Sequence, residues 1–275
     1  MVNYIEAELA PARNDGQIKI YGADAFEGMR RAGGLAAECL DAVNDVIAPG
    51  VPTQVIDDFV YEFGMARGAL PATIGYKGYT KSTCTSINHV VCHGIPGDKP
   101  LRDGDIVNID VTYIVDGWHG DSSRMYKVGA VKRAAERLIE ITYESLLRGI
   151  AVIRPGATTG DIGHAIQEFA EAERCSVVRD FCGHGVGRLF HDSPNILHYG
   201  SPGEGVELRP GMIFTVEPMI NLGRPHVKIL ADGWTAVTRD RSLSAQFEHS
   251  VGVTETGCEI FTLSPKDIMC PPSGG

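Results

Sequence analysis

Apolar residues recur at helical spacing in two pairs of segments, which predicts four helices. In the first pair, the spacing predicts a helix over 23–47 and a second over 53–66. Thr53 is expected to cap the start of the second helix. In the second pair, the same spacing predicts helices over 131–149 and 159–174.

Alternating apolar and β-branched residues predict strands after each pair of helices. These strands cover about 104–115, 118–128, 211–217 and 245–253. Asp116-Gly117 separates the first two, and an Asp-Gly pair between two such runs is a strong signal for a hairpin. Helices followed by antiparallel strands, repeated once, predict an α+β fold with helices packed on one side of a largely antiparallel sheet.

Two short phrases recur at nearly the same distance along the chain. Residues 48–53 (APGVPT) resemble residues 154–159 (RPGATT), at an offset of 106 positions. Residues 101–110 resemble residues 208–217 at an offset of 107 positions, and this match aligns Asp110 with an acidic residue. The repeat indicates two related halves, each a helix pair followed by strands. Chance similarity of the helix, Pro-Gly and helix phrase is the alternative.

The composition is typical of a soluble globular protein, because 43% of the 275 residues are hydrophobic and 22% are charged. A formal net charge of −10 argues against nucleic acid as the main partner. The acidic excess has two interpretations: an ordinary acidic protein, or one in which some acidic residues are metal ligands. No apolar run approaches the roughly 20 residues that a membrane-spanning helix needs.

The chain ends and the cysteines predict a cytoplasmic location. Residues 1–10 contain two glutamates and lack the apolar stretch of a signal peptide. The seven cysteines are odd in number and show no CxxC spacing, which favours free thiols over a zinc finger. We interpret residues 1–17 as an N-terminal extension, 18–263 as the main domain and 264–275 as a tail, in which 270–275 is expected to be disordered.

The predicted hairpin brings two carboxylates together. If Asp116-Gly117 is a two-residue turn, Thr112 faces Asp121, and Asp110 projects from the same face. The two carboxylates are then diagonal neighbours, with Cα atoms roughly 7–8 Å apart, close enough to share a cation. Without a cation, one of them would take up a proton. The alternative is a pair of solvated side chains, which fits Asp110 poorly because it lies in the apolar run 107–111.

Two glutamates occupy comparable positions. Glu217 follows the apolar run 213–216 and precedes Pro218, which cannot donate in a strand ladder, so the strand ends near Glu217. Glu248 lies within 245–251, again an acidic residue in an apolar strand. Four such residues, distributed over two related halves, predict a carboxylate-rich site.

Histidines complete the candidate site. His184 lies in the glycine-rich segment 183–187, His191 follows it, and His93 precedes a glycine. Glycine beside a histidine lets the backbone approach a metal or a substrate. For each histidine the alternative is a structural role, and we assign that role to His119, His164, His198 and His226.

Seven segments around these residues resemble type I methionine aminopeptidases, in the order and spacing of that family. They are 92–96 (CHGIP), 108–111 (NIDV), 120–123 (GDSS), 183–188 (GHGVGR), 190–191 (FH), 215–219 (TVEPM) and 242–249 (SLSAQFEH). The resemblance covers about 18–263 and implies a catalytic domain with the pita-bread fold: a curved antiparallel β-sheet covered by helices, with pseudo-twofold related halves. This expectation agrees with the repeat.

The resemblance implies a metalloaminopeptidase that removes the N-terminal methionine from nascent polypeptides and prefers a small second residue. The five metal ligands that it implies are Asp110, Asp121, His184, Glu217 and Glu248. They would hold two divalent ions, with Asp121 and Glu248 bridging them. Oxygen-rich ligands with one imidazole suit Mn, Fe(II) or Co, and Zn is a further candidate.

The resemblance also assigns roles in catalysis and substrate binding. Glu217 would relay a proton to the leaving amine, His191 would hydrogen-bond the carbonyl oxygen, and His93 would contact the peptide nitrogen or the second residue. The implied methionine pocket has plain core packing as the alternative for each member: Cys84, Tyr76, Phe190 and Trp234. The implied partners are the N-termini of nascent chains, with the ribosome as a candidate, and neither a membrane nor direct reading of nucleic acid; a monomer is expected.

His89 and Asp192 depart from the family pattern, which usually has glutamate at both positions. Neither is an implied ligand, so we expect small changes in contacts at the rim of the site or in rate. Two other functions remain as alternatives. One is an Xaa-Pro peptidase of the same fold, although such enzymes usually carry a separate N-terminal domain and little chain precedes His93. The other is a non-catalytic binding protein, in which loss of ligands would be expected.

Overall fold

The computed structural model describes residues 2–268. The segment 270–275, for which we predict disorder, lies outside the described residues. Of the tail predicted to begin at residue 264, only 264–268 is therefore described.

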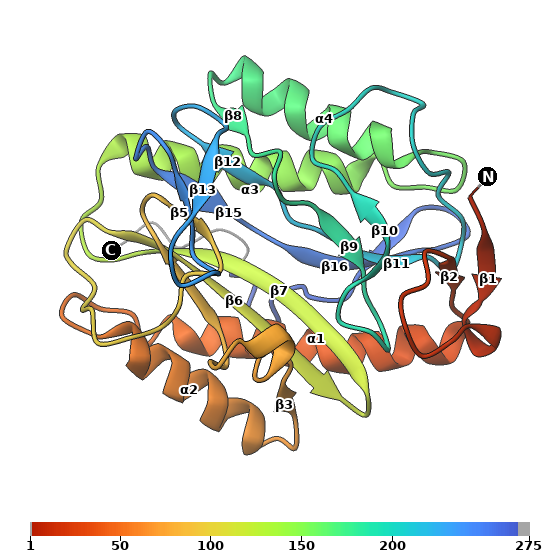
Figure 1. Ribbon diagram of the computed structural model, residues 1–275, viewed down its shortest axis with the longest axis horizontal. Helices are drawn as coiled ribbons and strands as arrows, with labels where there is room; N and C mark the ends of the chain where they lie inside the picture. The colour runs from red at the N-terminus through yellow and green to blue at the C-terminus, as the bar shows by residue number, and fades with distance from the viewer. Residues whose placement is uncertain (1, 269–275) are drawn as a thin grey trace.

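Four α-helices form two pairs within the described part of the chain (Figure 1). Their bounds are α1 Ala23–Val43, α2 Thr53–Met65, α3 Arg133–Ala151 and α4 Thr159–Ala172, and two short 3₁₀ helices are η1 Ala7–Leu9 and η2 Tyr76–Gly78. The helix predicted over 23–47 ends earlier, at Val43. Val46 lies in the turn that follows the helix and Ile47 lies just beyond that turn, and both still pack against the core, which explains why the apolar spacing continued past the helix end. None of the helices in residues 2–268 has the length and apolar character needed to cross a membrane.

The predicted cap at Thr53 is wrong. Pro52 is the N-cap of α2, and Thr53 is its first helical residue. The Thr53 hydroxyl instead donates to the Gly97 carbonyl oxygen at 3.1 Å and accepts from the Gly97 amide at 2.9 Å. The Thr53 hydroxyl therefore bonds to Gly97, which is distant in sequence, and does not cap the backbone of its own helix. In the second half, Thr158 does cap α4 through a reciprocal pair of hydrogen bonds with Asp161.

The strands are short except for one long hairpin. Their bounds are β1 Tyr4–Glu6, β2 Ile18–Ile20, β3 Leu70–Pro71, β4 Cys84–Ile87, β5 Val90–Cys92, β6 Ile106–Val115, β7 Trp118–Lys127, β8 Ser176–Val177, β9 Gly183–Gly185, β10 Asp192–Ile196, β11 Ile213–Val216, β12 Met219–Asn221, β13 Val227–Ile229, β14 Ala236–Thr238, β15 Ser244–Gln246, β16 His249–Val253 and β17 Cys258–Ile260. The hairpin register is confirmed, with Val115 opposite Trp118 and Thr112 opposite Asp121. The strand predicted over 245–253 is divided into β15 and β16.

Each helix pair covers the strands of its own half. In the first half, β6 lies between β4 and β7, and its alternate residues Ile109, Val111 and Tyr113 pack in one core with α1 and α2. In the second half, β11 lies between β9 and β16, and Phe214 and Val216 pack in a core with α3 and α4. The helices therefore cover one face of the strands, and residues such as Asp110 project from the other. Figure 1 shows the two helix pairs and the strands between them.

The N-terminal segment folds back onto the domain. β1 pairs in parallel with β2, and the Tyr4 hydroxyl donates to the Glu207 carbonyl oxygen at 2.7 Å. Tyr4 is partly buried against the core of the second half. Residues 4–6 are thus part of the folded unit, at the edge where β2 contacts β10 (Figure 1).

Candidate functional site

The β6–β7 hairpin supplies two carboxylates on one face. Asp121 lies opposite Thr112, and the Thr112 hydroxyl donates to Asp121 Oδ1 at 2.7 Å. Asp110 lies two residues before Thr112 on the same strand. The hydrogen bond orients Asp121, and the strand alternation directs Asp110 to the same side.

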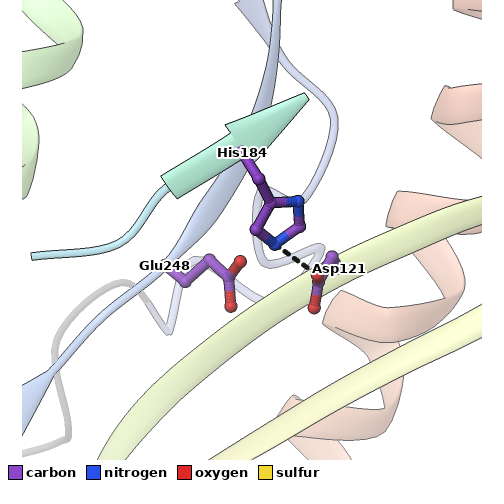
Figure 2. A group of neighbouring side chains, drawn as sticks. All are labelled: Asp121, His184 and Glu248. Atoms are coloured by element: carbon purple, nitrogen blue, oxygen red, sulfur yellow. Dashed lines mark ion pairs between the residues drawn. The ribbon is translucent and has the colours of Figure 1, made fainter. Parts of the chain in front are cut away.

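Glu248 reaches this hairpin through a link between the two halves. The Glu248 amide donates to the Ser123 carbonyl oxygen at 3.0 Å, and the Ser122 hydroxyl donates to the Glu248 carbonyl oxygen at 2.7 Å. The Ser250 hydroxyl donates to the Asp121 carbonyl oxygen at 2.7 Å. These bonds join the start of β16 to β7, so that the Glu248 and Asp121 side chains converge (Figure 2).

His184 enters the site on the glycine-flanked strand β9. A Cβ atom at Gly183 would lie 2.3 Å from the Thr215 carbonyl oxygen, and one at Gly185 would lie 2.2 Å from the Ser193 carbonyl oxygen. Both positions therefore need glycine, because β9 is held closely between β10 and β11. The His184 side chain points from this strand toward Asp121, with 3.6 Å between Nε2 and Oδ2 (Figure 2).

Glu217 approaches His184 from the end of β11. Its Oε1 atom lies 3.5 Å from His184 Nε2 and accepts a hydrogen bond from the Thr215 hydroxyl at 2.8 Å. Its Oε2 atom accepts from Gln246 Nε2 at 3.3 Å. The Glu217 amide donates to Nε2 of the buried His198 at 3.1 Å. Backbone and side chain are both held, so the direction of the carboxylate is well defined.

The four carboxylates are electrostatically unfavourable neighbours. Desolvation raises the pKa of Asp110 to about 7. Desolvation, followed by repulsion from neighbouring carboxylates, raises the pKa of Asp121, Glu217 and Glu248 well above the usual value. Desolvation lowers the pKa of His184 to about 4. The imidazole is therefore neutral near pH 7 and is available as a metal ligand.

The donor set fits a divalent cation. One ligand atom each from Asp121, His184 and Glu248 lies within 4.8 Å of the others. In residues 2–268, no lysine or arginine forms an ion pair with the four carboxylates, so the protein itself does not neutralise them. Bound cations would supply the missing positive charge. Asp110 and Glu217 lie outside the tight group of three but line the same cavity.

A cavity of about 290 Å³ opens onto these groups. All eleven residues that the sequence predicted for the site line it. They are Tyr76, Cys84, His93, Asp110, Asp121, His184, Phe190, His191, Glu217, Trp234 and Glu248. The structure thus brings together residues separated by more than half of the chain.

Aromatic contacts form the wall of the cavity opposite the carboxylates. Tyr76 stacks on His191 with ring centroids 5.0 Å apart and contacts Phe190 at 4.9 Å. His93 meets Trp234 edge-on at 6.0 Å. His93 has a φ of 57°, a left-handed conformation that is uncommon for histidine and that turns its side chain into the cavity. These contacts leave an apolar compartment next to the ionisable groups.

Several further residues line the cavity but were not predicted as site residues from the sequence. Phe181 and Cys182 directly precede the His184 segment, Cys92 precedes His93, and Met219 follows Glu217, so proximity to a motif could have indicated them. Gln246 lies within the segment 242–249, two residues before Glu248, and could have been found in the same way. No local signal marks the remaining ones, which are Thr73, Lys77, Tyr79 and Asp180.

One of the histidines assigned to a structural role contacts the site from behind. His198 is fully buried, and its Nε2 atom accepts the hydrogen bond from the Glu217 amide. His198 does not line the cavity, so its contribution is to hold the backbone of Glu217 in place.

The model of metallopeptidase family M24 matches residues 27–255. This chain belongs to metallopeptidase family M24. Membership in M24 makes the chain a metal-dependent peptidase and agrees with the divalent metal site that the donor set fits. The fold of the M24 chain is the pita-bread fold, as the sequence predicted.

Curated M24 relatives are similar over nearly their whole length. The chain is 59% identical over 257 residues to the methionine aminopeptidase of Rickettsia prowazekii, which covers 93% of this chain and 99% of the relative. It is 52% identical over 254 residues to the methionine aminopeptidase of Escherichia coli (strain K12), covering 92% of this chain and 96% of the relative.

Solved structures with this fold differ widely in their sequence identity to the chain. The crystal structure of methionine aminopeptidase from Rickettsia prowazekii matches with a TM-score of 0.89 and 58% identity, covering 90% of this chain and 100% of that one. Prolidase from Pyrococcus furiosus matches with a TM-score of 0.72 and 22% identity, and the match covers 88% of this chain but 65% of the prolidase. The second likeness shows the shared fold alone.

Proposed function

We propose that this chain is a metal-dependent aminopeptidase that removes the N-terminal methionine from polypeptides. The observation that carries the proposal is that a metal-fitting group and an apolar, thiol- and aromatic-lined compartment share one cavity. The M24 membership and the identity with named methionine aminopeptidases support the same reaction. All five implied ligands are present, which argues against a binding protein without activity.

The proposed metal centre holds two divalent ions. Its ligands are Asp110, Asp121, His184, Glu217 and Glu248. Four carboxylates carry the charge that two divalent cations neutralise, and the raised carboxylate pKa values support a need for that charge. One imidazole among oxygen ligands, with no thiolate, suits Mn, Fe(II) or Co, with Zn as a further candidate.

When bound, divalent ions supply Lewis acidity that polarises the scissile carbonyl and lowers the pKa of water. Glu217 is the proposed proton carrier from the attacking water to the leaving amine. Its carboxylate is held by Thr215 and Gln246, so the proton moves at a defined position. In the metal-free protein, desolvation and repulsion from Asp121 raise the pKa of Glu217, so this carboxyl group holds a proton more readily than an exposed glutamate before a cation binds.

His191 and His93 are the proposed contacts to the peptide. His191 has an exposed edge and its ring centroid lies 4.1 Å from that of His184, so its imidazole can donate to a carbonyl oxygen bound beside the metal centre. His93 lines the same cavity between Phe181 and Trp234, where it can contact the peptide nitrogen or the second residue. Both would favour the transition state by donating to an oxygen or orienting the amide.

The proposed methionine pocket is formed by Cys84, Tyr76, Phe190 and Trp234. A thioether gains from contact with aromatic rings and with a polarisable thiol. Tyr79 packs edge-on against Trp234 at 5.0 Å and extends the same wall. Because aromatic rings and a thiol line this part of the cavity, we expect a preference for an unbranched apolar side chain such as methionine, followed by a small second residue.

We also propose a location, partners and domain limits for the chain. The chain acts in the cytoplasm on the N-termini of nascent chains, with the ribosome as a candidate partner, and as a monomer. Residues 18–263 form the catalytic domain, between the N-terminal segment 1–17 and the tail 264–275. A basic surface for reading nucleic acid is not expected, given the formal net charge of −10.

A peptide panel on the full-length chain tests the function. After exhaustive chelation, Mn, Co, Fe(II) or Zn is added back, and release of the first residue is measured from Met-Ala-Ser, Leu-Ala-Ser and Ala-Pro-Ser. We expect metal-dependent cleavage of Met-Ala-Ser far above the other two. Preferred cleavage of Ala-Pro-Ser would instead assign an Xaa-Pro aminopeptidase. Activity that survives chelation would refute the metal dependence.

A further inference from the structure

A buried ion pair lies outside the carboxylate centre and has no place in the mechanism above. It joins Lys19 Nζ to the Asp192 carboxylate, and the two side chains are 6% and 3% exposed. Burying two charges costs desolvation that their attraction repays only in good geometry, so a buried pair is weak evidence for stability alone. Removing one partner of such a pair is costly, because it leaves the other charge buried and uncompensated.

The pair connects the N-terminal segment to the residue that follows His191. Lys19 lies on β2, and Asp192 is the first residue of β10. His191 faces the cavity, where it stacks on Tyr76 and touches His184, whereas Asp192 is buried away from the cavity. The adjacent side chains of His191 and Asp192 therefore point in different directions, His191 toward the cavity and Asp192 toward β2.

Tyr21, on the same face of the N-terminal segment as Lys19, contacts the start of the segment 187–192. Tyr21 lies two residues after Lys19, so the two side chains project from one side of an extended chain. A Cβ atom at Gly187 would lie 2.7 Å from the Tyr21 hydroxyl oxygen, which shows how closely the loop rests on Tyr21. Residues 187–192, here called the histidine strap, are therefore held at both ends by positions 19 and 21.

Between these two anchors the histidine strap has little regular structure. Residues 187–191 form bends, and β10 begins only at Asp192. The first two residues of the strap are also tied to the β6–β7 hairpin, because the Gly187 carbonyl oxygen accepts from the His119 amide at 2.9 Å and Arg188 Nη1 donates to the Asp116 carbonyl oxygen. Beyond them, no strand ladder holds Phe190 and His191. The position of the His191 ring therefore depends on the anchors at the strap ends and on the rings that it contacts.

We propose that Lys19, through its buried ion pair with Asp192, is a positioning residue that holds the histidine strap and so keeps His191 aligned over the cavity. The proposal rests on the proposed function and adds a role for the N-terminal segment in it.

The test is a double-mutant cycle between Lys19 and His191 on the full-length, metal-loaded protein. Lys19→Met removes the charge and keeps most of the volume. We expect Lys19→Met to lower kcat for Met-Ala-Ser about tenfold, since small misplacement of a catalytic group is costly, and to have little further effect in a His191→Ala background. Asp192→Glu keeps the ion pair and should retain kcat within about twofold of the unsubstituted chain.

A stability control separates positioning from loss of folding. Ile56→Ala opens a cavity in the core between α1, α2 and β6, remote from the strap, and should lower Tm with kcat unchanged. Lys19→Met would be purely structural if it lowered kcat by the same factor in both His191 backgrounds, or if Ile56→Ala lowered kcat as much at an equal loss of Tm. Either result overturns the proposal.

A second readout does not depend on turnover. Hydrogen exchange at amides 187–191 should be faster in Lys19→Met than in the unsubstituted chain, and unchanged in Ile56→Ala. Unchanged exchange in Lys19→Met would overturn the proposal even if the enzyme is active. An unsubstituted chain that does not cleave Met-Ala-Ser refutes the proposed function, and the exchange data still decide the anchoring. If Lys19→Met does not fold because it leaves Asp192 buried and unpaired, the double variant Lys19→Met/Asp192→Asn, which removes both charges, replaces it in both measurements, with the same expected direction and the same refuting results.

Discussion

Replacing Glu217 by glutamine isolates the proton carrier from the shape of the site. Glu217 accepts hydrogen bonds from Thr215 at 2.8 Å and from Gln246 at 3.3 Å. Glutamine has nearly the same shape and keeps one acceptor oxygen, but it cannot take up or release a proton near neutral pH. General acid–base catalysis contributes about 10²–10⁴ in rate, or about 3–5 kcal/mol, so we expect kcat to fall by that factor.

Stability should change little in the same variant. One of the two hydrogen bonds to the side chain is weakened, which costs about 1 kcal/mol and lowers Tm by about 2–4 °C in a domain of this size. The change also removes a carboxyl group whose pKa is raised by desolvation and by repulsion from Asp121, which offsets part of that cost in the metal-free protein. The expected shift in Tm is therefore at or below this range.

The assay is methionine release from Met-Ala-Ser at saturating metal, so that a loss of metal affinity is not mistaken for a loss of proton transfer. Glu207→Gln is the matched control, because it makes the same chemical change at a side chain that is 56% exposed. We expect Glu207→Gln to behave like the unsubstituted chain. Turnover of Glu217→Gln within about tenfold of that chain would refute the reasoning, because it lies below the range for acid–base catalysis.

Three further predictions concern packing, charge and pH. Gly185→Ala should lower the free energy of unfolding by about 1–3 kcal/mol, because the added Cβ atom would meet backbone atoms. Gly97→Ala is the control and should not, because the space around Gly97 is open, and the Tm values of the two variants test the difference. Asp41→Asn leaves the buried Arg124 without its charge partner and should cost about 3–5 kcal/mol in denaturant unfolding, with kcat maintained in the folded fraction. The pKa of Asp110 is raised from 3.8 to about 7, so its contribution to metal-free stability is fully present below pH 3.8 and is lost as pH rises through about 7. The rise in Tm on adding metal should therefore be larger above about pH 7 than below it, and an equal rise at both would contradict the argument.

Local patterns predicted much of the fold. The Asp116-Gly117 turn set the hairpin register, because a two-residue turn leaves one pairing, and the alternation then assigned Asp110 and Asp121 to one face. Apolar spacing predicted the positions of the four helices correctly, but it predicted their end residues less accurately. The predicted end at Ile47 and the predicted cap at Thr53 are both wrong, because Ile47 packs on the core from outside the helix and Thr53 forms hydrogen bonds with Gly97.

The candidate site was predicted less completely on its apolar side. Acidic residues in apolar strands are conspicuous, because a buried carboxylate needs a partner. Aromatic and aliphatic residues in a pocket wall look the same in sequence as core residues. Tyr79 lines the cavity yet follows no pattern that distinguishes it from its buried neighbours, whereas Met219 is marked only by its place close to Glu217.

The sequence by itself determined the helix pairs, the hairpin and the set of acidic residues and histidines that had to be explained, because periodicity, turn chemistry and the cost of burying charge are local properties. Only the tertiary structure decided how distant segments meet. A hydrogen bond between Ser122 and Glu248, 126 positions apart, joins the two halves. An ion pair between Lys19 and Asp192, 173 positions apart, holds the end of the histidine strap. Neither contact follows from local spacing, because the chain between the partners can close such a loop in many ways and only the packing of the whole domain selects one.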